Sequence, residues 1–218
     1  MANGNRTEWD DSAYITIRRR RDALLRPLSL LLVRLGVPAP VISLLGVALA
    51  GVTCWSLEGS SLAAFGAFLG ALVCDALDGA VARQSGTESP AGKVVDHACD
   101  TATFLLVLLA IGRSGLSSIS QISVSALLAI PLLLLAIQVR RKRSQAQLEP
   151  SGGFLAHVYK VPIYGAFLLY TAGGANLLEP AVRVANFTAG FSLLLVVAAV
   201  FLTSRRTAAA APTPQSRS

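Results

Sequence analysis

Four aspartates interrupt a chain that is otherwise strongly apolar in this region. Between the runs LAAFGAFLGALVC and TATFLLVLLAIG lies the stretch DALDGAVARQSGTESPAGKVVDHACD, whose four aspartates are Asp75, Asp78, Asp96 and Asp100. A charged side chain inside a membrane span costs about 2.5 kcal/mol or more. Four carboxylates in one short stretch therefore imply a compensating ligand, most simply a metal ion.

The composition of the whole chain is typical of a membrane protein. Of its 218 residues, 53% are hydrophobic and 14% are charged, and the mean hydropathy is +0.59. That is enough apolar chain for several spans, and it leaves too little for a separate soluble domain. The net charge is +7, but the basic residues gather at the ends of apolar runs. Membrane topology accounts for that distribution, so no nucleic-acid partner is expected.

The apolar runs predict an all-α integral membrane protein with six transmembrane helices and an N-terminal interfacial helix. Residues 14–35 mix six arginines with Ile, Leu and Val, which favours an amphipathic helix on the cytoplasmic leaflet, bent at Pro27. The predicted units are a polar tail with this juxtamembrane helix at 1–36, a six-helix membrane domain at 37–204, and a disordered tail at 205–218. The predicted spans are 40–57, 61–83, 93–112, 118–139, 154–173 and 182–203.

The basic residues also predict the orientation. With the N-terminus inside, only Arg113 and Arg183 fall on the outer side of the membrane. Asp75 and Asp78 then lie at the end of the second span, and Asp96 and Asp100 lie at the start of the third. Both pairs are therefore expected at the same depth in the membrane, near the inner interface. We expect a protein of the cell (inner, cytoplasmic) membrane whose site faces the cytoplasm.

The spacing of the acids predicts that they meet. Members of the first pair are three residues apart and members of the second are four apart, so each pair shares one helix face. The breaker-rich loop QSGTESPAG predicts an antiparallel hairpin with the four carboxylates facing each other. Ligation by oxygen alone suits Mg²⁺ or Mn²⁺ rather than zinc. His97 and Cys99 are expected to point away from the acids.

Two glycines and an arginine accompany the acids. Gly79 and Gly92 remove side chains beside the two pairs, so a backbone or a ligand could come close. Arg83 lies about two helical turns after Asp75, where its planar guanidinium can reach a phosphate. The acids, glycines and arginine together describe a site for a metal-bound diphosphate.

With eight specified positions at the family's spacing, this stretch resembles the full signature of the CDP-alcohol phosphotransferase family. The matching residues are Asp75, Asp78, Gly79, Ala82, Arg83, Gly92, Asp96 and Asp100. The family's usual Pro-Asn before a hydroxyl residue is not kept, because Pro40 is followed by Val41, Ile42 and Ser43. No role is assigned to that segment.

The resemblance implies what each matching residue does. Asp100 would be the general base and could also contact a second metal ion. The resemblance therefore implies two divalent cations, Mg²⁺ or Mn²⁺. The membrane domain would then be catalytic. The implied metal ligands are Asp75, Asp78, Asp96 and Asp100, and the implied contacts with the cytidine diphosphate are Asp78, Gly79, Ala82, Arg83 and Gly92.

The implied reaction moves a phosphatidyl (lipid-phosphoryl) group from a CDP-lipid such as CDP-diacylglycerol to an alcohol, with release of CMP, in phospholipid biosynthesis. In one alternative, a CDP-amino-alcohol donates its head group to a diacyl lipid. In another, the acids form a relay in a proton- or cation-coupled transporter. The transporter gives no reason for the glycines, Arg83 or the spacing.

The acceptor and the oligomeric state are left open. The basic run at 140–143, with Lys160 after it, is most simply interpreted as the positively charged cytoplasmic flank of two membrane spans. Arg140, Arg141 and Lys160 could instead bind the phosphate of a sugar-phosphate acceptor. The small-residue pattern Gly66-x3-Gly70 permits a homodimer through membrane helices.

Overall fold

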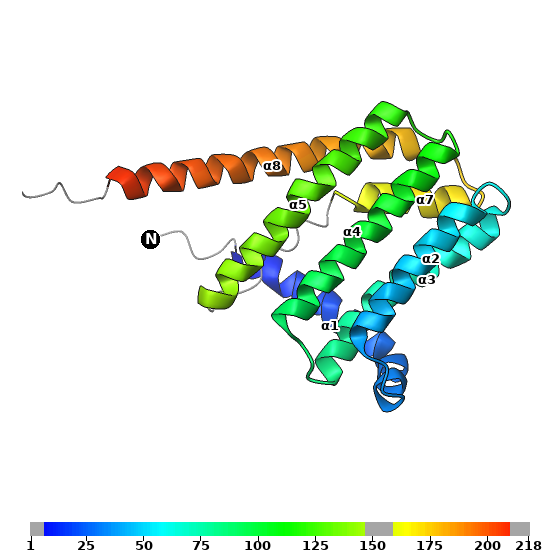
Figure 1. Ribbon diagram of the computed structural model, residues 1–218, viewed down its shortest axis with the longest axis horizontal. Helices are drawn as coiled ribbons and strands as arrows, with labels where there is room; N and C mark the ends of the chain where they lie inside the picture. The colour runs from blue at the N-terminus through cyan, green and yellow to red at the C-terminus, as the bar shows by residue number, and fades with distance from the viewer. Residues whose placement is uncertain (1–6, 147–158, 210–218) are drawn as a thin grey trace, which may run out of the picture.

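The computed structural model describes residues 7–146 and 159–209, with side chains described at 20–21, 23–134 and 159–194. Within these ranges the chain forms helices only, which confirms the all-α class. Figure 1 shows the helices as one layered bundle with the distal part of α8 extending beyond it. The seven helices are α1 (Thr7–Arg34), α2 (Ala39–Ser56), α3 (Ser61–Gln84), α4 (Pro90–Arg113), α5 (Ile119–Ala146), α7 (Val161–Thr171) and α8 (Leu178–Ala209).

Three of these helices, α2, α3 and α4, are long and apolar enough to cross a membrane. Shorter apolar stretches lie at Ile119–Leu134 in α5 and over α7. The helix bounds follow the spans predicted at 40–57, 61–83 and 93–112 closely, because breakers such as Gly86 and Pro90 mark their ends. A count of six membrane crossings stays a prediction, and part of the fifth predicted span lies outside the described residues.

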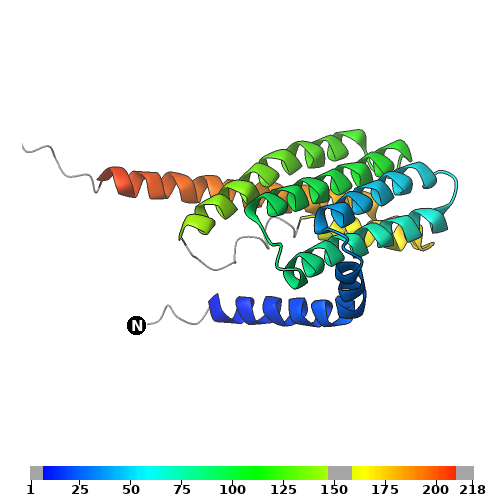
Figure 2. The ribbon, with the colours of Figure 1, turned by 60° about the horizontal axis from the view of Figure 1, so that its bottom comes forward.

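Helix α1 contains Pro27, and Figure 2 shows it changing direction along its length, as a proline inside a helix produces. Its second half packs against α3, and Leu25, Leu32 and Val33 cover a small apolar cluster that includes Ile42 of α2. Gln84 Nε2, at the end of α3, donates a hydrogen bond to Ser29 Oγ at 2.8 Å. The end of α3 that carries the first acid pair is therefore braced by α1.

The turn between α3 and α4 is built as the breaker residues predict. Gly86 has φ +65°, a conformation that glycine adopts without strain, and the Thr87 N–H donates to the Ala82 carbonyl oxygen at 3.1 Å. Ser89 then caps α4 by accepting from the Gly92 N–H at 2.9 Å, and Pro90 occupies the first turn. Figure 1 shows the resulting antiparallel pair of helices.

The packing of that pair differs from a tight hairpin, however. Helix α2 packs extensively against both α3 and α4, whereas α3 and α4 contact each other only sparsely. A Cβ at Gly46 of α2 would lie 3.2 Å from Cys74 Cβ, so a glycine is what lets α2 approach α3 this closely. The two acid-bearing helices are thus held apart, with α2 beside the space between them.

The small-residue pattern Gly66-x3-Gly70, which permits a homodimer, is partly occupied by packing within the molecule. A Cβ at Gly70 would lie 3.1 Å from Leu49 Cδ1 of α2, whereas a Cβ at Gly66 would meet nothing within 4 Å. The two glycines therefore do not present one equivalent outward face, and a homodimer stays a prediction.

An ionic and hydrogen-bonded cluster joins the turn between α4 and α5 to the start of α8, at the end of the bundle away from the acids. The Glu179 carboxylate accepts hydrogen bonds from the Ser117 hydroxyl and from the Ser118 N–H at 2.9 Å. It also accepts from Arg183 Nη2 at 2.9 Å. These donors, led by Ser117, lower the pKa of Glu179 to about 2.

We predict that Glu179→Gln lowers the melting temperature in detergent at pH 7, because the ionised carboxylate is what these donors bind. A lowered pKa means that this stabilisation is complete above about pH 5 and is lost as the pH falls toward 2. The gap between wild type and variant should therefore narrow with acidification, measured by thermal unfolding at several pH values. Glu58→Gln is the control, because its exposed pair with Arg113 at 3.4 Å contributes little. A gap that is constant between pH 7 and pH 3 would contradict the prediction.

Candidate active site

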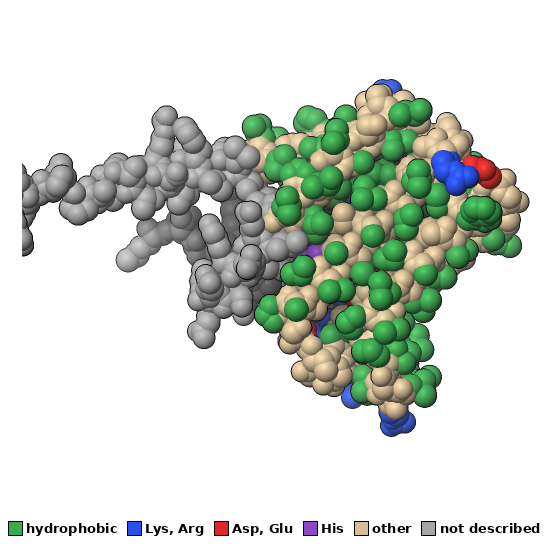
Figure 3. All heavy atoms as spheres, in the orientation of Figure 1, with side chains coloured by type: hydrophobic (Ala, Val, Ile, Leu, Met, Phe, Trp, Pro, Cys, Tyr) green, Lys and Arg blue, Asp and Glu red, His purple; other side chains and the backbone are tan. Residues whose placement is uncertain are grey.

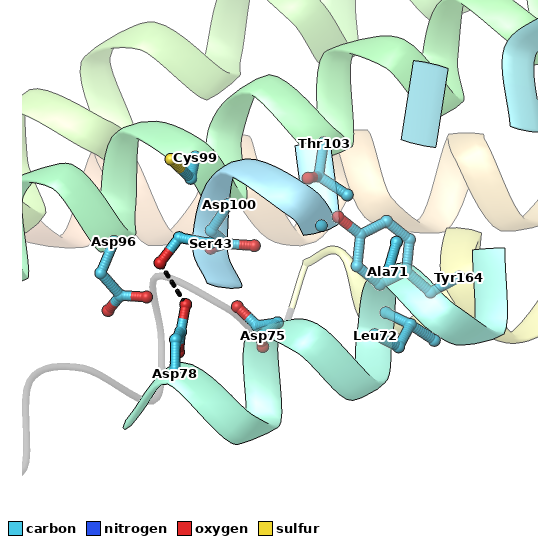
Figure 4. A pocket seen from close by; sticks show the side chains of 11 residues that line it. Ser43, Ala71, Leu72, Asp75, Asp78, Asp96, Cys99, Asp100, Thr103 and Tyr164 are labelled. Atoms are coloured by element: carbon cyan, nitrogen blue, oxygen red, sulfur yellow. Dashed lines mark hydrogen bonds between the residues drawn. The ribbon is translucent and has the colours of Figure 1, made fainter. Parts of the chain in front are cut away.

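The four aspartates line one pocket. Figure 4 shows their carboxyl groups directed into a common space, Asp75 and Asp78 from α3 and Asp96 and Asp100 from α4. The prediction that the four carboxylates face each other is therefore confirmed, although α3 and α4 do not pack closely against one another. The pocket residues are Ser43, Gly46, Ala71, Leu72, Asp75, Asp78, Asp96, Cys99, Asp100, Thr103 and Tyr164.

Helices α2 and α7 complete the walls of this pocket. Ser43 and Gly46 come from α2, and Tyr164 comes from α7, so four helices contribute to the site. The expectation that Cys99 points away from the acids is wrong, since Cys99 lines the pocket between Asp96 and Asp100. The face that α4 turns to the pocket is wide enough to include the residue before Asp100.

Asp78 is the most deeply buried of the acids. It is 5% exposed, and Ser43 Oγ donates a hydrogen bond to its Oδ2 at 2.5 Å. A buried carboxylate needs donors of this kind, because burial removes its water. Ser43 therefore has a role that the sequence did not assign, and the available signal was a hydroxyl residue near the start of an apolar helix.

Asp100 is paired with Lys160, the N-cap residue immediately before α7. Lys160 Nζ donates to Asp100 Oδ2 at 2.6 Å, and the two side chains are 6% and 14% exposed. The rings of Phe104 and Tyr159 lie 5.6 and 5.9 Å from the same ammonium. The structure thus brings Lys160 to the predicted general base, a contact that its assignment to the acceptor phosphate did not anticipate.

The predicted diphosphate contacts lie along the end of α3 and the start of α4. A Cβ at Gly79 would lie 3.1 Å from Arg83 Nη1, so the guanidinium lies over the bare backbone of Gly79. Ala82 is partly buried, and Gly92 contributes its N–H to the cap of α4. Their contact with a cytidine diphosphate stays a prediction.

Arg140 and Arg141, the other two residues assigned to an acceptor phosphate, lie in the last part of α5. Their side chains are outside the described residues. The structure therefore leaves that assignment as a prediction.

The pocket offers the donor chemistry that a hard divalent cation requires. Its four carboxylates are all oxygen donors, which suits Mg²⁺ or Mn²⁺. Across residues 7–146 and 159–209, however, no three His, Cys, Asp or Glu side chains are already arranged to hold one ion. Asp78 and Asp100 each engage a protein donor, Ser43 and Lys160. Metal ligation by the four aspartates therefore fits the residue types and stays a prediction.

The described architecture is that of a helical membrane protein whose apolar bundle encloses a carboxylate-lined pocket. The family model for CDP-alcohol phosphatidyltransferase matches residues 37–204, and the chain belongs to this family of transferases. No curated protein matches the chain significantly. The resemblance carried by the eight signature positions is thereby confirmed.

We predict that Lys160→Met costs about 3–5 kcal/mol of stability, because it leaves the buried Asp100 carboxylate without its cation. Asp100→Asn in the same chain should recover part of that loss, since no charge then remains to be paired. The measurement is a double-mutant cycle of denaturant unfolding in detergent with Lys160→Met, Asp100→Asn and the double variant. Strictly additive losses would show that the pair contributes nothing.

Proposed function

We propose that this protein transfers a phosphatidyl (lipid-phosphoryl) group from a CDP-lipid such as CDP-diacylglycerol to an alcohol, with release of CMP, in phospholipid synthesis. The observation that carries the proposal is the convergence of all four signature aspartates on one pocket. Membership of the CDP-alcohol phosphatidyltransferase family supports the reaction class. The choice of lipid donor rests on the pocket's place in an apolar bundle, beside which acyl chains can lie.

We further propose that the chain crosses the membrane six times with its N-terminus inside, so that the pocket opens to the cytoplasm. Support comes from the basic residues, which gather at the acid-bearing end of the bundle. On the face that Figure 3 shows, hydrophobic side chains are spread over the described bundle and charged side chains are few, as contact with lipid requires. A water-soluble acceptor and a lipid donor would then meet near the inner interface.

Binding of the donor is assigned to the end of α3. Gly79 and Ala82 present little side chain there, so a nucleotide can lie against the helix, and Arg83 offers a planar cation to the diphosphate. Gly92, in the first turn of α4, is proposed to contact the same nucleotide. When bound by Asp75, Asp78, Asp96 and Asp100, two divalent cations would neutralise negative charge on the diphosphate.

The transfer step needs a base beside the acceptor hydroxyl, and Asp100 is proposed for it. The hydroxyl oxygen forms a bond to the phosphorus attached to the lipid, and its proton passes to the Asp100 carboxylate. The bond from that phosphorus to the CMP oxygen breaks, and CMP leaves with the electron pair. Lys160 holds Asp100 Oδ2, which fixes the orientation of the carboxylate at the pocket wall.

The base assignment predicts that Asp100→Asn lowers turnover by about 10²–10⁴-fold while binding of the CDP-lipid is largely kept. Asp75→Asn and Asp96→Asn should lose metal-dependent binding as well. The measurement is CMP release by purified protein from CDP-diacylglycerol with Mg²⁺, beside a binding assay for the same lipid. Glu88→Gln, an exposed carboxylate in the turn between α3 and α4, is the control and should keep full activity. Normal turnover by Asp100→Asn would show that another group is the base.

The same assay separates the proposed donor from the alternatives. CMP release from CDP-choline in the presence of a diacyl lipid, and none from CDP-diacylglycerol, would reverse the direction of transfer. Cation counterflow in liposomes without any CMP release would replace the enzyme with a transporter. A screen of inositol, inositol phosphate, glycerol 3-phosphate and serine then identifies the acceptor, including any that Arg140 and Arg141 would favour.

A further inference from the structure

One hydroxyl group in the pocket is buried without a partner. Tyr164 enters from α7, and its Oη has no hydrogen-bond partner in the described part of the chain. Figure 4 shows this hydroxyl directed into the pocket rather than away from it. An unsatisfied buried hydroxyl costs free energy and is rare in folded proteins, so a group outside the protein is expected to use it.

The ring that carries this hydroxyl is held firmly. It makes an edge contact with Phe68 of α3, with centroids 5.2 Å apart and planes at 76°. Phe104 of α4 lies 6.1 Å from the same ring. With aromatic neighbours on two other helices, the position of Oη is fixed before any ligand binds. Such preorganisation is what a selective contact requires.

The hydroxyl belongs to the side of the pocket where Asp100 lies. Tyr164 lies on α7 about one helical turn after Lys160, which caps the start of that helix and is bound to Asp100. Thr103 is nearly one turn beyond Asp100 on α4 and lines the same end of the pocket. The groups proposed to hold the donor, Gly79 and Arg83, follow Asp75 on α3, whereas Ala71 and Leu72, which line the pocket with Tyr164, precede it. The partner of Tyr164 is therefore the molecule that Asp100 activates.

The chemistry of this end suits an uncharged polar group. Its polar side chains are the hydroxyls of Tyr164 and Thr103, and its other neighbours are Ala71 and Leu72. The ammonium of Lys160, four residues before Tyr164, is already paired with Asp100. A neutral hydroxyl both donates and accepts hydrogen bonds, so it can satisfy a tyrosine and a threonine together.

We infer that Tyr164 is a specificity-determining residue that binds a second, non-reacting hydroxyl of the acceptor, and that the acceptor is a polyol. This inference rests on the proposed function, because it concerns the alcohol that Asp100 activates. An acceptor with a single hydroxyl leaves Tyr164 unsatisfied, and the pocket discriminates against it for that reason.

The test compares two acceptors in two proteins. Wild type and Tyr164→Phe are assayed for CMP release from CDP-diacylglycerol with matched pairs that differ by one hydroxyl. The pairs are glycerol 3-phosphate with 3-hydroxypropyl phosphate, and inositol with a deoxyinositol, and serine is assayed beside them. Wild type should prefer the polyol in kcat/KM by roughly tenfold or more, and Tyr164→Phe should lose most of that preference. The KM for CDP-diacylglycerol should be unchanged.

Stability gives an independent measurement. Because Tyr164 Oη has no partner, its removal should leave the melting temperature of the ligand-free protein unchanged or raised. Ser56→Ala is the matched control. Its buried Oγ is also without a partner in the described chain, but Ser56 lies at the far end of α2 and does not line the pocket. It should change no acceptor ratio. If Tyr164→Phe does not fold, Thr103→Val tests the same subsite from α4.

The outcomes separate this inference from the function on which it rests. Equal acceptor ratios in wild type and Tyr164→Phe, with CMP released by both, would overturn the subsite and keep the transferase. Preferential use of serine by wild type would do the same. No CMP release by wild type with any acceptor would overturn the transferase and the subsite with it.

Discussion

The fold depends on keeping carboxylates inside an apolar bundle at a tolerable free-energy cost. Charges in such surroundings are stable only when donors or cations face them. The structure supplies these from outside the acid-bearing helices, since Ser43 of α2 binds Asp78 and Lys160 binds Asp100. The packing of α2 and α7 around α3 and α4 is therefore also what makes the acid cluster possible.

Helix α7 contributes more to the site than its length suggests. It has 11 residues, yet it supplies Tyr164 to the pocket and follows directly on Lys160. Edge contacts among Phe68, Phe167 and Tyr164 lock it against α3, with ring centroids 5.0–5.2 Å apart. Aromatic packing in the core thus sets the positions of an ammonium and a hydroxyl at the site. A substitution at Phe68 is therefore expected to change the catalytic activity as well as the stability of the protein.

Local rules predicted the helices and the acid faces well, because breakers and residue spacing act along the chain. Gly86, Ser89 and Pro90 mark the turn before α4, and the three- and four-residue spacings place each acid pair on one face. The contacts that complete the site join distant segments. Ser43 and Asp78 are 35 residues apart, and Lys160 and Asp100 are 60 apart. No periodicity reports such neighbours, which is why these partners were missed. The lining position of Cys99 was missed for a local reason, because the face of α4 that lines the pocket is wider than the spacing of the two acids indicates.

The contact between Gly79 and Arg83 links two signature positions that sequence comparison treats as separate. The guanidinium occupies the volume that a side chain at position 79 would need, with Nη1 only 3.1 Å from where its Cβ would stand. A methyl group there would require the guanidinium to shift by a few tenths of an ångström. A larger side chain at position 79 is therefore expected to move the Arg83 guanidinium away from the place where the structure holds it.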